Sequence, residues 1–590
     1  MRHWIAAVTC AAMMTGSNSH AQTIYPIDRA EILVGSHFDL KVEFAGIANA
    51  ANVAVTVNGE DHAKVLGRAA DLVVEQEKSE DKSALILREV TLNEPGVYRI
   101  KATDGVNTME VTWSVYATGP RAAKNVILFV GDGMSLAHRV AARLLSKGIT
   151  EGKAHGKLAM DDMPQMALVQ TAGADSIITD SANSASAYAT GHKSSVNAMG
   201  VYADRTENAF DDPKVETITS LVKRRLNLAV GVVTNTEVWD ATPAAMMVHT
   251  RRRGTHDQIV EQFFTGKPDV LMGGGSANFM PRVAGGDGRR ADGVDYVAKF
   301  RDAGYTVATN ATELAASHGA PKLLGLFNTS YMDGVLDRKF LKGRNVPKFP
   351  DQPDLTDQLR ASLDILSRQP NGFFLMVESG LIDKYTHLLD MERAVYDTIM
   401  LDNTVKLARE WSAARGNDTL ILVLADHTHP ISLVGTISDD MSTIPNAPMR
   451  ERIGAYDKAG FPNYQAADKD GYPPRVDASR RLAIFSAAAP DYCETFRPKL
   501  DNPNDPTQEG KDKGTYDAKE DYCSKPGAMR RLGNLPKYLD QGVHSGEDVV
   551  LTAAGPGSER VRGAMDNTEV FRVMAEALGL GHNLTTGQAK

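Results

Sequence analysis

The stretch NVILFVGDGM, residues 125–134, places five consecutive apolar residues, Val126 to Val130, directly before a Gly-Asp-Gly turn. A continuous apolar run of this length is typical of a strand that is buried on both faces of a mainly parallel sheet. Four similar runs follow at residues 228–234, 268–275, 372–377 and 420–425, with helical-looking segments between them. The sequence therefore predicts an α/β fold with a mainly parallel central sheet flanked by helices.

Polar residues follow three of these runs where each predicted strand ends. Asp132 follows the first run, ESGLIDKYTH (378–387) the fourth and DHTH (426–429) the fifth. Ligand sites in open α/β sheets gather at the carboxyl ends of the strands, so we expect these side chains to meet. With His544 of VHSGED they form a carboxylate–imidazole set suited to zinc, with oxygen-rich positions left for magnesium. The members are Asp132, Glu378, Asp383, His387, Asp426, His427 and His544.

The stretch TDSANSASAYATG, residues 179–191, presents Ser181 at the start of a predicted helix of small residues. The surrounding sequence contains neither a G-x-S-x-G elbow nor an S-x-x-K lysine, which are common contexts of a nucleophilic serine. The group that would activate Ser181 is therefore not identified by this stretch alone.

The N-terminus has the features of a removable secretory signal, residues 1–21. Arg2 and His3 form a short basic region, an apolar stretch follows, and Ser-His-Ala at positions 19–21 resembles a cleavage site. An uncleaved anchor is the alternative, although the apolar segment is short for a bilayer span. We expect an exported protein, periplasmic or secreted, without a membrane span.

Two further regions differ from the α/β pattern. Residues 22–118 hold short alternating β-branched stretches, which predict a small antiparallel β-sandwich, immunoglobulin-like, as an accessory domain. The main domain is expected at 122–590, with an insertion at about 431–540 that is rich in Pro, Gly, Asp and Lys. The insertion holds Cys493 and Cys523, and an even pair in an oxidising compartment predicts a disulfide; two unrelated thiols are the alternative. The net charge of −9 argues against a nucleic-acid-binding protein.

From about residue 122 to 580 the chain resembles the alkaline phosphatases. The resemblance rests on VILFVGDGM, TDSANSASAYATG, DATPAA, VESGLIDKYTH, ADHTH and HSGEDVVLTAAGPGS, which match the family's motifs in the family's order. It implies an alkaline-phosphatase-like fold and a zinc- and magnesium-dependent hydrolase of phosphate monoesters. Ser181 is implied as the nucleophile, with a phosphoserine intermediate that water then hydrolyses.

The resemblance also implies ligands for two zinc ions and one magnesium ion. The first zinc would be held by Asp383, His387 and His544, the second by Asp132, Asp426 and His427, and the magnesium by Asp132, Thr242 and Glu378. For Thr242, a buried turn hydroxyl without a ligand role is the alternative. We expect His249 to be structural or to support the site indirectly, and His429 to lie near the site without being a ligand.

Arg253 in HTRRRGTH is implied as the clamp on two phosphate oxygens, because it stands thirteen residues after Asp240, as in the family. Either of the two preceding arginines is the alternative. Asp240 and Lys384 match the bacterial type of the family, in which this pair tunes the magnesium site and contacts phosphate through water. A plain surface charge is the alternative for Lys384, and Asp180 is expected to orient Arg253.

The expected function is hydrolysis of small phosphate monoesters, with release of inorganic phosphate and an alcohol. A phosphodiesterase or sulfatase of the wider superfamily is one alternative, and a catalytically inactive binding protein is another. No nucleic-acid partner is expected, and a homodimer is left open. The sequence does not identify the physiological ester.

Overall fold

The apolar run at 125–131 becomes a central strand of a large mixed sheet in the computed structural model, which describes residues 22–343, 345–441, 449–495 and 506–582. The predicted signal segment, residues 1–21, lies outside the described residues. Within the described chain, ten strands form this sheet, in the order β16-β17-β15-β14-β18-β10-β19-β27-β13-β28. Their bounds are β16 (Thr306–Ala308), β17 (Leu323–Leu326), β15 (Val270–Gly274), β14 (Ala229–Glu237), β18 (Phe373–Ser379), β10 (Asn125–Gly131), β19 (Thr419–Leu424), β27 (Val549–Ala554), β13 (Gln165–Gln170) and β28 (Arg562–Asp566).

The sheet is mostly parallel, as the sequence predicts. The five apolar runs form β10, β14, β15, β18 and β19, in which every residue is buried. Neighbouring pairs from β16 to β19 run parallel, whereas β27 runs antiparallel to both β19 and β13. Because these strands have helices on both sides, they need apolar residues on both faces, and this removes the alternation of a half-exposed strand.

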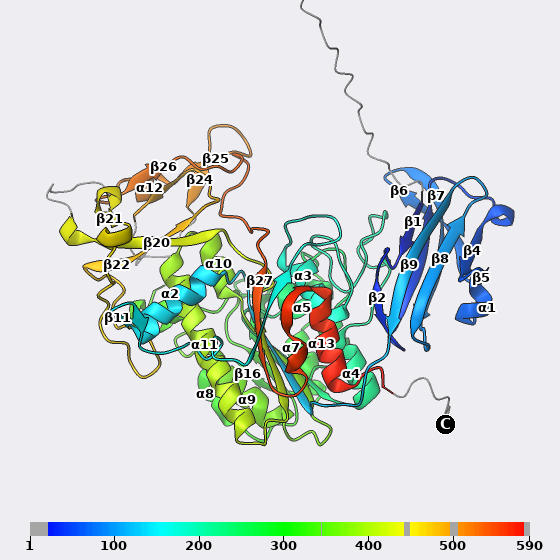
Figure 1. Cartoon of the computed structure of the whole chain (residues 1–590), viewed down its shortest axis with the longest axis horizontal. Coiled ribbons are helices and arrows are strands. Elements are labelled where there is room, and N and C mark those ends of the chain that lie inside the picture. The colour runs from blue at the N-terminus through cyan, green and yellow to red at the C-terminus, as the bar shows by residue number, and fades with distance from the viewer. Residues whose placement is uncertain (1–21, 344, 442–448, 496–505, 583–590) are drawn as a thin grey trace, which may run out of the picture.

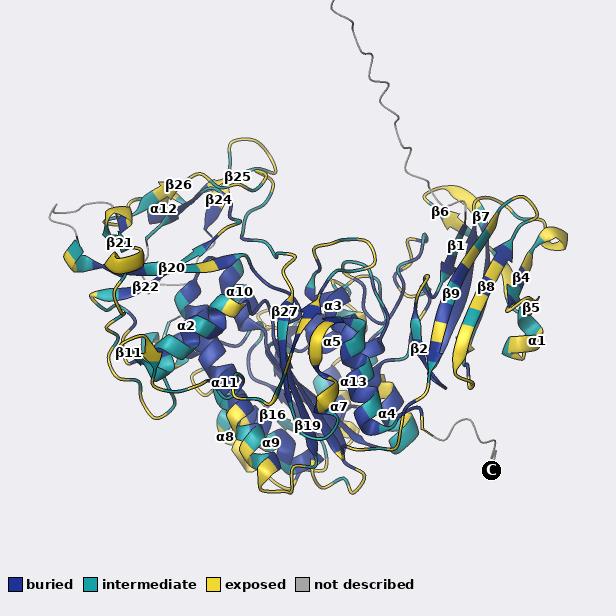
Figure 2. Cartoon of the chain, in the orientation of Figure 1, coloured by how far each residue is buried: buried dark blue, intermediate teal, exposed yellow. Residues whose placement is uncertain are grey.

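Helices cover both faces of the sheet. Figure 1 shows α2 (Leu136–Lys147), α9 (Leu355–Leu366) and α11 (Met391–Ala413) on one side, and α3 (Ser181–Thr190), α4 (Ile218–Leu226), α5 (Ala241–Ala245) and α13 (Thr568–Leu578) on the other. The remaining helices of the main part include α6 (His256–Gly266), α7 (Tyr296–Asp302), α8 (Ala311–Ala316) and α10 (Leu381–His387). One continuous cluster of buried apolar side chains joins the sheet to both helical layers, and the strands are accordingly dark in Figure 2.

Residues 22–116 form two small sheets, here called the N-terminal sheets. One has the order β1-β3-β7-β6 and the other β2-β9-β8-β4-β5. The bounds are β1 (Gln22–Tyr25), β2 (Glu31–Leu33), β3 (Phe38–Phe44), β4 (Ala54–Val57), β5 (Glu60–Asp61), α1 (His62–Leu66), β6 (Asp71–Glu77), β7 (Glu80–Val90), β8 (Gly96–Thr103) and β9 (Thr108–Tyr116). Their inner faces share an apolar cluster around Trp113, whose Nε1 donates to the Pro26 carbonyl at 2.9 Å. The sequence predicts antiparallel pairing throughout, whereas in the structure β2 runs parallel to β9. The immunoglobulin-like topology stays a prediction.

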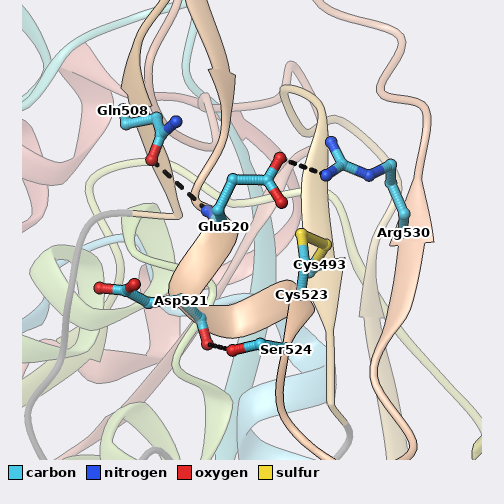
Figure 3. The surroundings of a disulfide bond; sticks show 7 residues. All are labelled: Cys493, Gln508, Glu520, Asp521, Cys523, Ser524 and Arg530. Carbon is cyan, nitrogen blue, oxygen red and sulfur yellow. Dashed lines mark hydrogen bonds and ion pairs between the residues drawn. A yellow bond between two sulfur atoms is a disulfide. The ribbon is translucent and has the colours of Figure 1, made fainter.

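The predicted insertion contains small two- and three-stranded sheets on the opposite side of the main sheet from the N-terminal sheets (Figure 1). Its elements are β20 (Ile431–Ser438), β21 (Ile453–Gly454), β22 (Arg480–Ser486), β23 (Tyr492–Glu494), β24 (Thr507–Glu509), β25 (Tyr516–Ala518), α12 (Glu520–Cys523) and β26 (Met529–Arg531). Cys493 and Cys523 form a disulfide that ties β23 to α12, beside the ion pair of Glu520 with Arg530 (Figure 3). The prediction of a disulfide is therefore confirmed.

Among the described residues, no helix combines the length and the apolar character that a bilayer span requires.

Candidate functional site

The site lies at the carboxyl ends of β18, β10 and β19, which are neighbours in the sheet. Asp132 follows β10, Glu378 lies near the end of β18, and Asp426 comes two residues after β19. The parallel register pairs Gly131 with Ser379. Asp132, Glu378 and Asp426 therefore lie at the same edge of the sheet. The strand order thus brings together residues that are far apart in sequence, as expected for an open α/β sheet.

Three side chains form a first candidate ligand set. Asp383 and His387 lie one turn apart on α10, and His544 precedes β27. Asp383 Oδ1 is 3.3 Å from His387 Nε2 and 3.5 Å from His544 Nε2, and the two Nε2 atoms are 3.0 Å apart. A tetrahedron with zinc–ligand bonds of about 2.0–2.1 Å has edges of about 3.3–3.4 Å. The three atoms therefore fit three corners of a zinc site.

The tautomers of the two histidines strengthen this assignment. His387 Nδ1 donates to the Gly542 carbonyl at 2.5 Å, and His544 Nδ1 donates to the Thr179 carbonyl at 2.9 Å. Because a carbonyl can only accept, each ring carries a proton on Nδ1, and its Nε2 is the nitrogen left to bind a metal ion. Donation of the second ring nitrogen to a carbonyl is also the usual support of a metal-binding histidine.

A second set contains the predicted nucleophile. Ser181 Oγ is 3.2 Å from His427 Nε2 and 3.5 Å from Asp132 Oδ1. His427 Nε2 is in turn 3.3 Å from Asp132 Oδ1 and 3.3 Å from Asp426 Oδ2. Asp426 Oδ2 is buried without a hydrogen-bond partner in the described part of the chain, which a native protein tolerates only where something else satisfies the atom. Asp132, Asp426 and His427 form a group of possible metal ligands whose atoms lie within 4.8 Å of one another, with Ser181 Oγ adjoining it.

The predicted magnesium ligands lie on the adjoining elements. Thr242 is on α5, and its Oγ1 is buried and has no hydrogen-bond partner among the described residues. Glu378 Oε2 accepts hydrogen bonds from the hydroxyls of Thr234 and of Thr236, the latter at 3.3 Å. Thr242 and Glu378 offer a hydroxyl and a carboxylate, the oxygen ligands that magnesium prefers.

The electrostatics of the cluster favour a dication. Burial raises the pKa of Asp132, and the charges of Asp383 and Asp426 raise it further. Burial likewise raises the pKa of Asp426 and brings the pKa of Glu378 to about 7. Burial lowers the pKa of His427 well below its ordinary range, so this imidazole is neutral, the form that binds metals. Without a cation these carboxylates would take up protons instead.

Helix α3 begins at Ser181, and every one of its residues is buried. Asp180 caps it by accepting from the Asn183 backbone amide at 3.1 Å, and Asn183 returns a capping-box contact. Its polar side chains bond to neighbouring backbone: Ser184 Oγ donates to the Asp426 carbonyl at 2.6 Å. Small residues thus allow a fully buried helix whose N-terminal N–H groups face the site.

Arg253 reaches the site beside Ser181. Its Nη1 is 3.3 Å from Asp180 Oδ2 and its Nη2 is 2.6 Å from Asp240 Oδ1. Lys384 Nζ lies 3.0 Å from Asp240 Oδ2. Burial would raise the pKa of Asp240, but the charges of Lys384 and Arg253 outweigh it and hold the pKa well below its ordinary value.

The other arginines of HTRRRGTH and the nearby His249 do not join the contacts described for Arg253. Arg251 donates to the Thr206 carbonyl, away from Ser181, and Arg252 is exposed. His249 Nε2 contacts the Val215 carbonyl at 3.0 Å and is outside the candidate ligand sets.

Sequence reasoning missed two supporting residues, Gly133 and Thr234. Gly133 has a positive φ of 65°, and a Cβ there would lie 2.7 Å from His429 Cδ2, so the turn after β10 requires glycine. His429 was expected near the site without being a ligand; its Nε2 is 2.6 Å from Asp383 Oδ1, and it belongs to a group of possible metal ligands with Asp383, His427 and His544. The Gly-Asp-Gly spacing signals the first of these, whereas the Thr234 contact with Glu378 has no local sequence signal.

Comparisons with known proteins agree with this geometry. A profile of the family described as alkaline phosphatase matches residues 123–580. A streptomycin-6-phosphate phosphatase of Streptomyces griseus is 33% identical over 507 residues, covering 78% of this chain and 92% of that protein. A tissue-nonspecific alkaline phosphatase of Gallus gallus is 28% identical over 496 residues, covering 78% and 85%. The crystal structure of Thermus thermophilus alkaline phosphatase aligns with a TM-score of 0.54 at 24% identity, covering 79% of this chain and 93% of that one, which supports the fold.

Proposed function

The chain belongs to the alkaline phosphatase family, and we propose that it hydrolyses phosphate monoesters through a phosphoserine formed on Ser181. The observation that carries the proposal is the position of Ser181 Oγ. It lies within 3.2 Å of His427 Nε2 in a candidate metal-ligand set and starts a buried helix next to Arg253. In this proposal Ser181 Oγ lies between a bound cation and the phosphate, and His427 serves as a metal ligand.

The donor sets support two zinc ions and one magnesium ion. Asp383, His387 and His544 would hold one zinc; Asp132, Asp426 and His427, with Ser181, the other; Asp132, Thr242 and Glu378 the magnesium. When bound, these ions supply positive charge for a phosphate dianion and for the attacking and leaving oxygens of an in-line displacement.

The chain's own residues then account for the remaining steps. Ser181 Oγ attacks phosphorus, the bond to the ester oxygen breaks, and the alcohol leaves. Water attacks the phosphoserine, inorganic phosphate leaves and the hydroxyl of Ser181 is restored, so two displacements retain configuration at phosphorus. The N-terminal amides of α3 donate to phosphate oxygens. Arg253, oriented by Asp180 and Asp240, donates two N–H groups to two phosphate oxygens.

Two serine-to-alanine variants, which leave the charge of the protein unchanged, test the proposal. Turnover of 4-nitrophenyl phosphate and of bis(4-nitrophenyl) phosphate is compared for the wild type, Ser181→Ala and Ser367→Ala, all supplied with zinc and magnesium. Ser367 is exposed at the end of α9 and serves as the control. We expect dominant monoester turnover that Ser181→Ala abolishes and Ser367→Ala leaves unchanged. Dominant diester turnover by the wild type, or a fully active Ser181→Ala, would overturn the proposal, and no turnover of either ester would favour an inactive binding protein.

The same proposal includes a location outside the cytoplasm, periplasmic or secreted. The disulfide of Cys493 with Cys523 supports it, because such bonds persist in oxidising compartments. The homodimer that the sequence leaves open stays a prediction.

A further inference from the structure

One loop connects the N-terminal sheets to the arginine of the site. Residues 197–216, here called the bracing loop, follow α3 and return toward α4. At its start, the Asn197 amide donates to Asp180 at 3.2 Å, and the Asn197 carbonyl accepts from the Arg253 amide at 3.0 Å. The loop thus contacts the backbone of Arg253 and one of the carboxylates that orient its side chain.

Backbone pairing continues from Arg253 to the N-terminal sheets. Met199 pairs with Thr250, and Val201 pairs with Lys214 across the loop. Val215, the residue after Lys214, pairs with Phe38 at the start of β3. These hydrogen-bonded pairs form a continuous ladder from β3 through the bracing loop to the segment that carries Arg253.

A buried ion-pair network fastens the loop to the same sheet. Lys41, on β3, is 1% exposed, and its Nζ is 2.6 Å from Asp204 Oδ2 in the loop and 2.8 Å from Glu75 Oε2 on β6. Arg205, the next loop residue, is 2.6 Å from Glu75 and donates to the Phe44 carbonyl at 2.5 Å. Breaking a buried pair of this kind weakens the compensation of buried charge, so we expect the loss of Lys41 to shift the loop.

Two arginines extend the network. Arg251, two residues before Arg253, lies 3.7 Å from Asp204 and 3.8 Å from Asp212. From the other side, Arg88 on β7 donates to the carbonyls of Asp211 and Asp212, at 2.5 Å and 3.1 Å. The segment of Arg253 is therefore tied to the N-terminal sheets by side chains as well as by backbone.

We propose that the N-terminal sheets act as a brace for phosphate binding, with Lys41 and Arg88 as positioning residues that hold Arg253 through the bracing loop. This inference rests on the proposed function, because it assigns Arg253 to phosphate. A bidentate guanidinium contact depends on orientation, so a small shift of the Arg253 backbone weakens it. In Figure 1 the N-terminal sheets lie on the side of α3 away from the predicted insertion, with loops between them and α3.

The test measures the inhibition constant of inorganic phosphate for the full-length enzyme. Lys41→Met removes the buried amine, and Arg88→Leu removes the two contacts to the loop together with the ion pair to Asp39 at 2.8 Å. Lys101→Met is the control, because Lys101 is an exposed residue of β8, in the other N-terminal sheet. We expect the inhibition constant to rise about fivefold to tenfold for the first two variants and to stay unchanged for the control.

The same substitutions are then repeated in an Arg253→Ala background. If the brace acts through Arg253, neither substitution raises the inhibition constant further, because the interaction it supports is already gone. An unchanged constant in the single variants, or an equal rise with and without Arg253, would overturn the inference. If Lys41→Met does not fold, Arg88→Leu decides, since the Arg88 side chain is 39% exposed and its loss is milder. Wild-type turnover of the monoester reports separately on the proposed function.

Discussion

Removal of Arg253 is the substitution whose effect the structure defines best. Arg253→Ala takes away a guanidinium that Asp180 and Asp240 orient, yet both carboxylates keep other partners. Asp240 retains Lys384 at 3.0 Å, and Asp180 retains the Asn183 amide at 3.1 Å. We therefore expect the variant to fold, so that a change in phosphate binding reports on the lost contact.

The magnitude follows from the two hydrogen bonds that the fork offers. Each charge-assisted hydrogen bond contributes about 1.5–3 kcal/mol. Because Arg253 also stays bonded to Asp180 and Asp240, we take a net loss of about 2–4 kcal/mol, which is about 30-fold to 700-fold in phosphate affinity. Arg253→Lys keeps the charge but not the planar fork, and we expect it to recover only part of this loss.

The assay is competitive inhibition of 4-nitrophenyl phosphate turnover by inorganic phosphate. Arg252→Ala is the control, since its side chain is exposed and its inhibition constant should match the wild type. Arg251→Ala should have an intermediate effect, because Arg251 contacts the bracing loop. If Arg251→Ala or Arg252→Ala weakened phosphate inhibition more than Arg253→Ala, the wrong arginine would have been assigned.

Three further predictions concern stability. Chelation of the metal ions should lower the unfolding temperature by about 7 °C. Two ions at a thousand times their dissociation constants add about 8 kcal/mol to the free energy of unfolding. Calorimetry checks this, and an unfolding temperature that does not change when zinc is restored would contradict the proposed ligand sets. Burial raises the pKa of Asp212 to about 7, so the free energy of unfolding of the wild type falls as pH rises from about 4 to 7. Asp212→Asn lacks this titration, so its free energy of unfolding relative to the wild type should be about 2 kcal/mol higher at pH 8 than at pH 5. An equal difference at both pH values in thermal melts would argue against that shift. Cys523→Ser should lower the hydrogen-exchange protection of β24 to β26 by about 3 kcal/mol while monoester turnover continues, and unchanged protection would show that the disulfide does not stabilise them.

The strands of the main sheet could be predicted because their signal is local. Residues 125–131 are apolar without interruption and became a strand buried on both faces, since helical layers on both sides leave no polar face. The strand ends then located the ligand sets, because parallel neighbours end at one edge. The parallel pairing of β2 with β9 was not predicted, since short alternating strands specify a face but not a partner.

The position of Arg253 shows where a local signal ends. Three consecutive arginines have the same chemistry, and spacing from Asp240 favoured one of them only through resemblance. In the structure the choice follows from non-local contacts: Asn197 fixes the Arg253 backbone, while Arg251 turns toward carboxylates of the bracing loop. Lys41 contacts that loop through Asp204, and the N-terminal region that contains Lys41 has no catalytic or ligand-binding sequence motif. In the proposed brace, long-range pairing of a buried charge helps to position Arg253, and such a pair leaves no periodicity or spacing in the sequence from which it could be inferred.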